Sequence, residues 1–159
     1  MERKTAADFE KLMTLALGQA RRGWARGEVP VGAVVVRGQE VVGRGFNRTI
    51  GGRDPSAHAE IVALRQAGRR LGNHRLAGCC LVVTLEPCVM CLGAAVQARV
   101  DGIVFGAADP KAGAVSSIGR FPFAKMNHRP QVWGGVLGLE CGRILKDFFR
   151  ARRKTRASH

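Results

Sequence analysis

The sequence predicts an α/β fold in which one five-stranded mixed sheet carries helices on both faces. Three observations lead to this prediction. The chain has 159 residues, which suits a single domain with a substantial core. Helical and strand patterns follow one another in the order α, β, β, α, β, α, β, β, α. The stretch at 79–85 is apolar throughout, as expected of a strand covered on both sides.

The first third of the chain is expected to form a helix and then a β-hairpin. Thr5 and Asp8 resemble a capping box, and apolar residues then recur at helical spacing, so residues 6–23 are predicted to be an amphipathic helix. The stretches "VPVGAVVV", "RGQE" and "VVGRGFN" indicate two apolar strands around a polar turn. Asn47 falls at the end of the second strand.

The middle third is expected to contain helix, strand and helix. "GGRDPSAH" is typical of a loop, and a helix is predicted from about Ser56, with His58 and Glu60 in its first turn. The buried strand 79–85 follows. Pro87 is then well placed as the first residue of the next helix, because proline favours that position.

The last third is predicted to contain two strands and a basic helix. "DGIVFG" and "QVWGGV" indicate the strands. Between them, residues 109–130 lack clear periodicity, and connections of this length tend to be functional. The final helix and tail, from about residue 139, are strongly basic. We find no internal repeat or linker, so one domain over residues 1–159 is expected.

The charge balance favours a polyanionic partner. The chain has 26 basic and 12 acidic residues and a net charge of +14, and binding driven by phosphate contacts is salt-dependent. A generally basic proteome would produce the same balance. No apolar run approaches the roughly 18 residues of a membrane span. The odd number of cysteines, five, and the acidic residues before the apolar stretch 12–20 favour the reducing cytoplasm over secretion.

Two cysteines and a histidine are candidate metal ligands. Cys88 and Cys91 are spaced i, i+3 at the start of a predicted helix, where the helix dipole favours thiolates. His58 starts another helix, and if both helices begin at one edge of the sheet, the three residues could surround one Zn²⁺. Three protein ligands leave a fourth position for water. Glu60 is better placed to shuttle protons than to bind the metal.

Specific motifs then indicate a family. "HAE" at 58–60 and "PCVMC" at 87–91 match the H-x-E…P-C-x-x-C pattern of zinc nucleobase deaminases. The chain resembles the bacterial tRNA-specific adenosine deaminases, within the cytidine/deoxycytidylate deaminase superfamily, over nearly its whole length. The resemblance implies a three-layer α/β/α cytidine-deaminase-like fold. The other stretches that carry it are, in order, "EVPVGAVVV", "GFNR", "DPSAHAEIVALRQ", "NHRL", "TLEPCVMC", "VFGA", "MNHR" and "DFFRARR".

The resemblance also implies an activity. It implies hydrolytic deamination of the wobble adenosine in a tRNA anticodon to inosine, with release of ammonia. It implies one zinc ion per subunit, with water or hydroxide as the fourth ligand, and Glu60 as the residue that protonates the ring nitrogen and the departing amine. Asn47 corresponds to the family residue that hydrogen-bonds the base, and the backbone of Ala59 to a further contact in the pocket.

Further correspondences concern the RNA and the oligomer. Asp109 and Lys111 fall in the loop that touches nucleotides beside the target, while Phe149, Arg150 and Arg153 match a helix end near the anticodon loop. The resemblance therefore implies that the partner is a tRNA anticodon stem-loop. It further implies a cytoplasmic homodimer in which one RNA touches both subunits.

Each of these residues also has a simpler interpretation. A C-x-x-C pair alone could be a redox pair or half of a structural zinc site. Cys79, Cys80 and Cys141 are nominal fourth ligands, although buried core positions are the simpler interpretation of all three. Glu60 could be only a favourable acid in a first helical turn, and Asn47 could merely end a strand.

Two functional alternatives remain beside the RNA deaminase. A deaminase of a free base or nucleotide, such as guanine, cytosine or deoxycytidylate, would explain the zinc site but not the basic helix. A non-catalytic, zinc-stabilised nucleic-acid binder would explain the charge but not "HAE". His74 stands where the family commonly has tyrosine, which puts a stacking contact there in doubt, and Phe148 and Phe149 are expected to face different ways on their helix.

Overall fold

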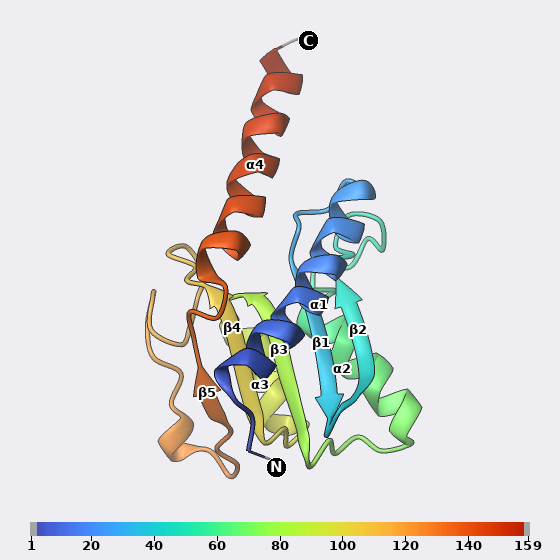
Figure 1. The fold of residues 1–159 in the computed structure, drawn as a ribbon, viewed down its shortest axis with the longest axis vertical. Helices are drawn as coiled ribbons and strands as arrows, with labels where there is room; N and C mark the ends of the chain where they lie inside the picture. Colours follow the sequence, from blue (N-terminus) through green and yellow to red (C-terminus); the bar gives the residue numbers. More distant parts are fainter. Residues whose placement is uncertain (1–2, 158–159) are drawn as a thin grey trace.

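The computed structural model describes residues 3–157 and confirms the predicted order of elements (Figure 1). The capping box formed by Thr5 and Asp8 is present at the start of the first helix. In chain order the elements are α1 (Ala6–Ala25), β1 (Gly32–Arg37), β2 (Glu40–Phe46), α2 (Ala59–Leu71), β3 (Cys79–Leu85), α3 (Val89–Gln97), β4 (Gly102–Ala107), the short 3₁₀ helix η1 (Phe123–Lys125), β5 (Gln131–Trp133) and α4 (Gly138–Ala157).

The five strands form one mixed sheet in the order β2-β1-β3-β4-β5. β1 is antiparallel to both β2 and β3, whereas β3, β4 and β5 run parallel to one another. The end of β2, the start of β1 and the ends of β3 and β4 therefore all lie at one edge of the sheet, the upper edge in Figure 1. The segments that enter α2 and α3 both leave the sheet at this edge.

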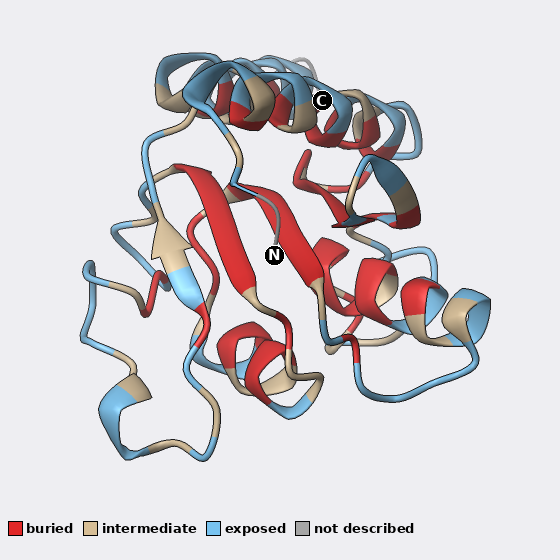
Figure 2. Cartoon of the chain, turned by 60° about the horizontal axis from the view of Figure 1, so that its bottom comes forward, coloured by how far each residue is buried: buried red, intermediate tan, exposed pale blue. Residues whose placement is uncertain are grey.

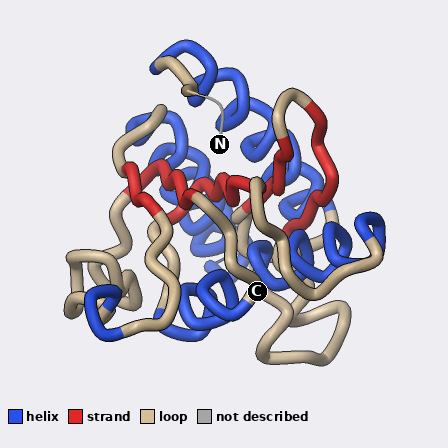
Figure 3. Tube along the Cα trace, turned by 90° about the horizontal axis from the view of Figure 1, so that it is seen from below, coloured by secondary structure: helices blue, strands red, loops and turns tan. Residues whose placement is uncertain are grey.

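Helices cover both faces of the sheet, as predicted, and make three layers (Figure 3). Side chains alternate along the central strands: Val35 and Val83 belong to the core under α2 and α3. Val34 and Val82 belong to the second core, under α1 and α4. Figure 2 shows the central strands buried along their length. The uninterrupted apolar run of β3 is explained, because it contributes side chains to both cores.

Helix α4 packs on the sheet only through its first half. Cys141 and Phe148 are buried, whereas every described residue after Phe148 is exposed. The second half of the helix projects beyond the sheet (Figure 1). Phe149 is 42% exposed, so the two adjacent phenylalanines face different ways, as expected. Within residues 3–157, no helix is both long and apolar enough to cross a bilayer.

The boundaries of two helices differ from prediction at the functional edge. α3 begins at Val89, with Cys88 as its extended N-cap, so Pro87 is not the first helical residue. The Pro87 carbonyl instead accepts a hydrogen bond from the N–H of Ala114, which draws it into the neighbouring loop. His58 is likewise the N-cap of α2 and lies just before its first turn. An N-cap keeps non-helical backbone angles, so the candidate metal ligands His58 and Cys88 both lie at a junction of loop and helix.

Two further boundaries were also predicted wrongly. α1 continues through Gly23 to Ala25, because Gly23 faces Phe46 of β2 at a distance suited to a residue without a side chain. The fifth strand has three residues instead of six. The chain turns away after Trp133, and Gly135 has a positive φ of 84°.

Candidate active site

The structure brings the three predicted metal ligands together at the upper edge of the sheet. The Nδ1 atom of His58 lies 3.6 Å from Sγ of Cys88 and 3.5 Å from Sγ of Cys91. The donor atoms of all three lie within 4.8 Å of one another. Cys91 is buried, whereas the other two are half-buried. One imidazole and two thiols arranged in this way fit a metal ion that prefers nitrogen and sulfur ligands and keeps one position open.

The remaining cysteines lie away from this group. Among residues 3–157, it is the one cluster of at least three potential metal ligands. Cys80 and Cys141 belong to the core under α1 and α4, and Cys79 starts β3 at the opposite edge of the sheet. Burial raises the pKa of Cys80 to about 12 and that of Cys141 to about 11. These thiols are packing residues, and a fourth cysteine ligand has no support.

Hydrogen bonds among the three candidate ligands shift their pKa values. The hydrogen bond that Cys91 donates to Cys88 lowers the pKa of Cys88 to about 4 and raises the pKa of Cys91. Hydrogen bonding with Cys88 also raises the pKa of His58, against the opposing effect of its partial burial. A bound cation would deprotonate both thiols, since coordination favours thiolate. The electrostatics of the group therefore suit a cation.

Glu60 lies beside these ligands in the first turn of α2. Its side chain is 4% exposed. Burial raises the pKa of its carboxyl group, opposed by its own backbone N–H, by a hydrogen bond with Cys91 and by the charge of His58. A buried carboxylate with a raised pKa next to a metal site is suited to accept and return a proton.

Asn47 links the end of β2 to the start of α2. Its Oδ1 accepts a hydrogen bond from the N–H of Ala59 at 2.9 Å, and its Nδ2 donates one to the carbonyl of Val29 at 3.2 Å. A primary amide can make four hydrogen bonds, so these two fix its orientation and leave capacity for a ligand. A Cβ on Gly45 would lie 2.5 Å from the Ala59 carbonyl oxygen, so glycine there permits α2 to approach β2 closely.

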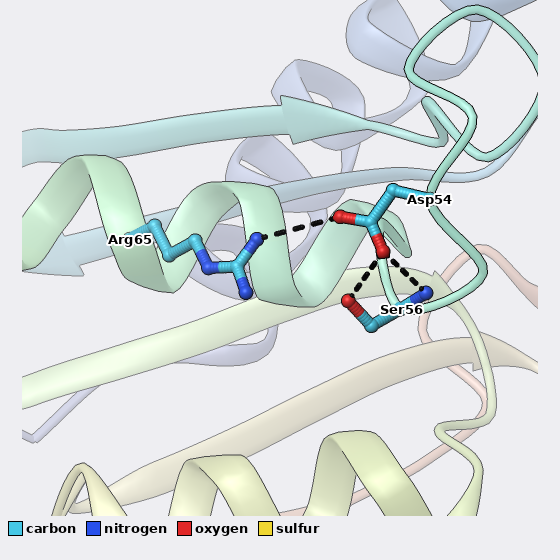
Figure 4. Close-up of polar contacts among 3 residues, drawn as sticks. All are labelled: Asp54, Ser56 and Arg65. Atoms are coloured by element: carbon cyan, nitrogen blue, oxygen red, sulfur yellow. Dashed lines mark hydrogen bonds and ion pairs between the residues drawn. The ribbon is translucent and has the colours of Figure 1, made fainter.

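A tight turn sets the backbone before His58. Oδ1 of Asp54 accepts hydrogen bonds from the N–H of Ser56 at 2.9 Å and from its hydroxyl at 2.7 Å (Figure 4). The other oxygen lies 3.8 Å from Nη1 of Arg65 on α2. The Ser56 hydrogen bonds are the main reason that the pKa of Asp54 is lowered, with Arg65 contributing. The turn and the helix are thereby held in one orientation around His58.

The residues matched to RNA contacts line one cavity. It has a volume of about 710 Å³ and lies between α4 and the segment after β4. Val29, the hydrogen-bond partner of Asn47, also lines it, which places the cavity next to the candidate active site. Of the sequence-predicted residues, its walls include Asp109, Lys111, Phe149, Arg150 and Arg153.

The sequence interpretation missed several residues of the site. Lys146 also lines the cavity; its spacing of three, four and seven residues from Phe149, Arg150 and Arg153 is the helical-face signal that would have indicated it. Two buried glutamates, Glu28 and Glu86, are each 2% exposed; both fall within stretches that carry the family resemblance, but the sequence interpretation gave them no role.

Two histidines lie away from the candidate metal ligands, whereas the segment at 116–125 contacts Glu86. His74 is exposed after the end of α2, and no contact given by the structure places it at the site. His128 contacts the Val100 carbonyl oxygen through Nε2 at 2.6 Å. The segment "SSIGRFPFAK" includes η1, and its two serines hydrogen-bond to Glu86.

Comparison with known proteins agrees with this geometry. A family model described as MafB19-like deaminase matches residues 7–153, so the fold and site define a protein of the deaminase class. The tRNA-specific adenosine deaminase of Haemophilus influenzae is 47% identical over 156 residues, which cover 95% of this chain and 89% of that protein. The chain belongs to the family of tRNA-specific adenosine deaminases.

Solved structures confirm the predicted fold class. One, from a study of A-to-I editing by tRNA:A34 deaminases at the wobble position, has a TM-score of 0.81 and 46% identity, and the match covers 85% of this chain and 99% of that chain. The guanine deaminase of Nitrosomonas europaea has a TM-score of 0.76 and 28% identity, with 87% and 83% covered. The fold therefore also occurs in an enzyme named for a free-base substrate.

Proposed function

We propose that this protein deaminates the wobble adenosine of a tRNA anticodon to inosine and releases ammonia. The observation that carries the proposal is the convergence of His58, Cys88 and Cys91 beside buried Glu60, in a chain 47% identical to a tRNA-specific adenosine deaminase. The balance is adenosine plus water giving inosine plus ammonia. A purely structural metal site would not require Glu60 in this position, and it would normally have four protein ligands.

We propose zinc as the ion held by the three ligands. One nitrogen and two sulfur donors match its preferences, and three protein ligands are typical of a catalytic zinc site. When bound, zinc would supply acidification of a water molecule, which makes a nucleophile available at neutral pH. The chain's contribution is the position of the donors. His58 and Cys88 are the N-caps of two helices and Cys91 lies in the first turn of α3, so all three lie at the same edge of the sheet.

Glu60 is proposed as the catalytic proton carrier. It accepts a proton from the attacking water and delivers it to the ring nitrogen of adenine. It then takes the proton of the hydroxyl group added at the ring carbon, as the carbonyl forms, and delivers it to the departing amine. Burial supports this role, because it raises the carboxyl pKa and keeps bulk water from competing for the proton. Asn47 and the backbone of Ala59 are proposed to hold the base, with the Asn47 amide oriented by Val29.

The cavity beside the site is proposed to receive the flanking nucleotides. Phe149 offers an exposed ring for stacking, and Lys111, Arg150 and Arg153 offer cations for phosphate. An adenine must leave the stacked loop to reach a buried centre, so contacts beside the site would hold the splayed RNA. We further propose that the enzyme acts in the cytoplasm as a homodimer, with both subunits touching one anticodon stem-loop.

A free-base deaminase is the second candidate function. Its support is the likeness to the guanine deaminase of Nitrosomonas europaea, with a TM-score of 0.76 at 28% identity. It leaves the exposed basic half of α4 without a role. Salt distinguishes the two functions, because turnover of a neutral base should be nearly indifferent to ionic strength, whereas RNA binding should weaken steeply.

The test is a substrate comparison with metal-loaded protein. An anticodon stem-loop containing a wobble adenosine, free adenosine, cytidine and guanine would be incubated in parallel, with inosine and ammonia measured. We expect inosine from the stem-loop, and loss of activity after chelation that added Zn²⁺ restores. Ammonia from guanine alone would favour the second candidate. A stem-loop with guanosine at the wobble position is the matched control.

A further inference from the structure

Glu86 lies between β3 and α3 with its carboxylate inside the loop that follows β4. It is 2% exposed and stands two residues before Cys88. Five donors from that loop surround it. Oε1 accepts from the N–H of Asp109 at 3.1 Å and from the Ser117 hydroxyl. Oε2 accepts from the N–H groups of Val115 at 3.0 Å, Ser116 at 3.0 Å and Ser117 at 3.2 Å.

The backbone around Glu86 is fixed to the same loop. Its N–H donates to the carbonyl of Ala107 at 2.8 Å, and the N–H of Ala114 donates to the carbonyl of Pro87 at 2.9 Å. Gly113 packs so tightly that a Cβ would lie 2.4 Å from Cδ of Glu86. The loop at 109–117 therefore closes around one carboxylate. At Gly113, where the loop comes closest to Glu86, there is no room for a residue larger than glycine.

The first three residues of this loop, 109–111, form part of one wall of the cavity. Asp109 and Lys111 lie in that wall, facing Phe149 and Arg150 of α4 across the cavity. Asp109 also shapes the start of the loop, since its Oδ1 accepts from the N–H of Lys111 at 3.0 Å. The position of these residues relative to the candidate metal ligands thus depends on what holds the loop. Glu86 holds it through five hydrogen bonds.

We propose that Glu86 is a positioning residue for the polynucleotide substrate. By holding the loop at 109–117, it sets the cavity wall at a fixed position relative to Cys88, the N-cap of α3. The inference rests on the proposed function, because it concerns how the substrate lies against that site. Small displacements of positioning groups can cost about 10²-fold in kcat/KM, so a carboxylate that never touches the RNA can still control its reaction.

The variant Glu86→Gln tests the proposal, because it preserves shape and removes the charge. One oxygen becomes an amide NH₂, which cannot accept from the loop N–H groups. We expect faster hydrogen exchange at residues 115–117, an unchanged metal content and kcat/KM for the stem-loop lower by about 10- to 100-fold. Most of that loss should appear in KM. Ser117→Ala, which removes one donor, should give the same changes to a smaller degree.

Two control variants separate positioning from general destabilisation. Glu28→Gln should accelerate exchange at residues 50–51 and leave residues 115–117 protected. Met13→Ala creates a cavity under α1 and lowers thermal stability, but it should leave KM unchanged below the melting temperature. An equal rise in KM for Met13→Ala would overturn the proposal.

Other results would also overturn the proposal. In Glu86→Gln, unchanged exchange at 115–117 would show that the loop does not depend on the carboxylate, and unchanged kcat/KM with faster exchange would show that its position is irrelevant. Loss of metal together with activity would assign Glu86 to the metal site instead. Failure of the proposed function is distinguishable, because wild-type protein would then form no inosine from the stem-loop at all.

Discussion

Two buried glutamates near the candidate active site have opposite environments. Glu60 is 4% exposed and Glu86 is 2% exposed, and each lies two residues from a candidate metal ligand. Burial raises the pKa of Glu60. Burial also acts to raise the pKa of Glu86, but the hydrogen bonds from Ser117, Ser116 and Asp109 outweigh it and lower the pKa.

The difference shows that burial alone does not make a carboxylate reactive. Donors that converge on a buried carboxylate stabilise its charged form and keep its oxygens occupied. Glu86 has such donors and is suited to structural anchoring. Glu60 lies beside the candidate metal ligands and has few donors, so the proposed proton exchange remains open to it. Substitutions of each residue should therefore affect different measurements.

The largest effect is expected for turnover in Glu60→Gln. The amide cannot carry the proton, so kcat should fall by roughly 10³-fold, within the range for loss of general acid–base catalysis. Metal content and affinity for the stem-loop should remain. Single-turnover kinetics with bound metal measured in parallel would check this. Glu40→Gln, at an exposed residue paired with Arg70, is the control, and full activity in Glu60→Gln would contradict the proposed mechanism.

The second-largest effect is expected in the free energy of unfolding, where Glu86→Gln should lose more than Glu60→Gln. Glu86→Gln should lower the free energy of unfolding by about 2–3 kcal/mol. Hydrogen bonds to a charged acceptor contribute about 1.5–3 kcal/mol each, and the remaining oxygen of the glutamine amide can still accept some of them. Glu60→Gln should change stability by less than about 1 kcal/mol, since the amide relieves a buried charge. Urea unfolding of both variants measures the difference. Equal losses in the two would show that their environments do not differ as described.

A third buried glutamate gives an intermediate case. Glu28, before β1, accepts from the N–H groups of Ile50 at 3.1 Å and Gly51 at 2.8 Å, and from the Thr49 hydroxyl at 3.4 Å. With three donors instead of five, Glu28→Gln should lose about 1–2 kcal/mol of stability. Urea unfolding beside Glu86→Gln provides the comparison. A loss larger than that of Glu86→Gln would show that donor number does not set the order.

The sequence indicated a candidate role for Glu60 but none for Glu86. Glu60 was identifiable because "HAE" has a fixed spacing from a metal ligand, and periodicity predicted the element order and the layers. Glu86 and Glu28 were not identifiable in this way, since most of their donors are backbone N–H groups from loops more than 20 residues away along the chain. Backbone donors have no side-chain signature, so only tertiary structure shows where they converge.

The exact starts of the ligand-bearing helices were missed for a related reason. Pro87 has the sequence signature of a first helical residue, yet a hydrogen bond from Ala114 holds it in the loop network. The cavity also depends on tertiary structure, because it joins the segment after β4 to α4. Lys146 shares a helical face with three predicted residues, but only the tertiary structure shows that this face and the segment after β4 enclose a cavity.

The smallest effect is expected for Asp8, a carboxylate whose pKa is shifted mainly by hydrogen bonds and little by burial. Asp8 is only partly buried, and hydrogen bonds from the backbone and side chain of Thr5 lower its pKa from the ordinary value of 3.8. A carboxylate with a lowered pKa stabilises the fold above its unfolded pKa and loses this contribution as pH falls through the folded pKa. The stability advantage of wild type over Asp8→Asn should thus be constant from pH 7 to pH 5 and shrink below about pH 4. Urea unfolding across this range measures it, and an advantage that grew on acidification would mean that Thr5 does not stabilise the charged form.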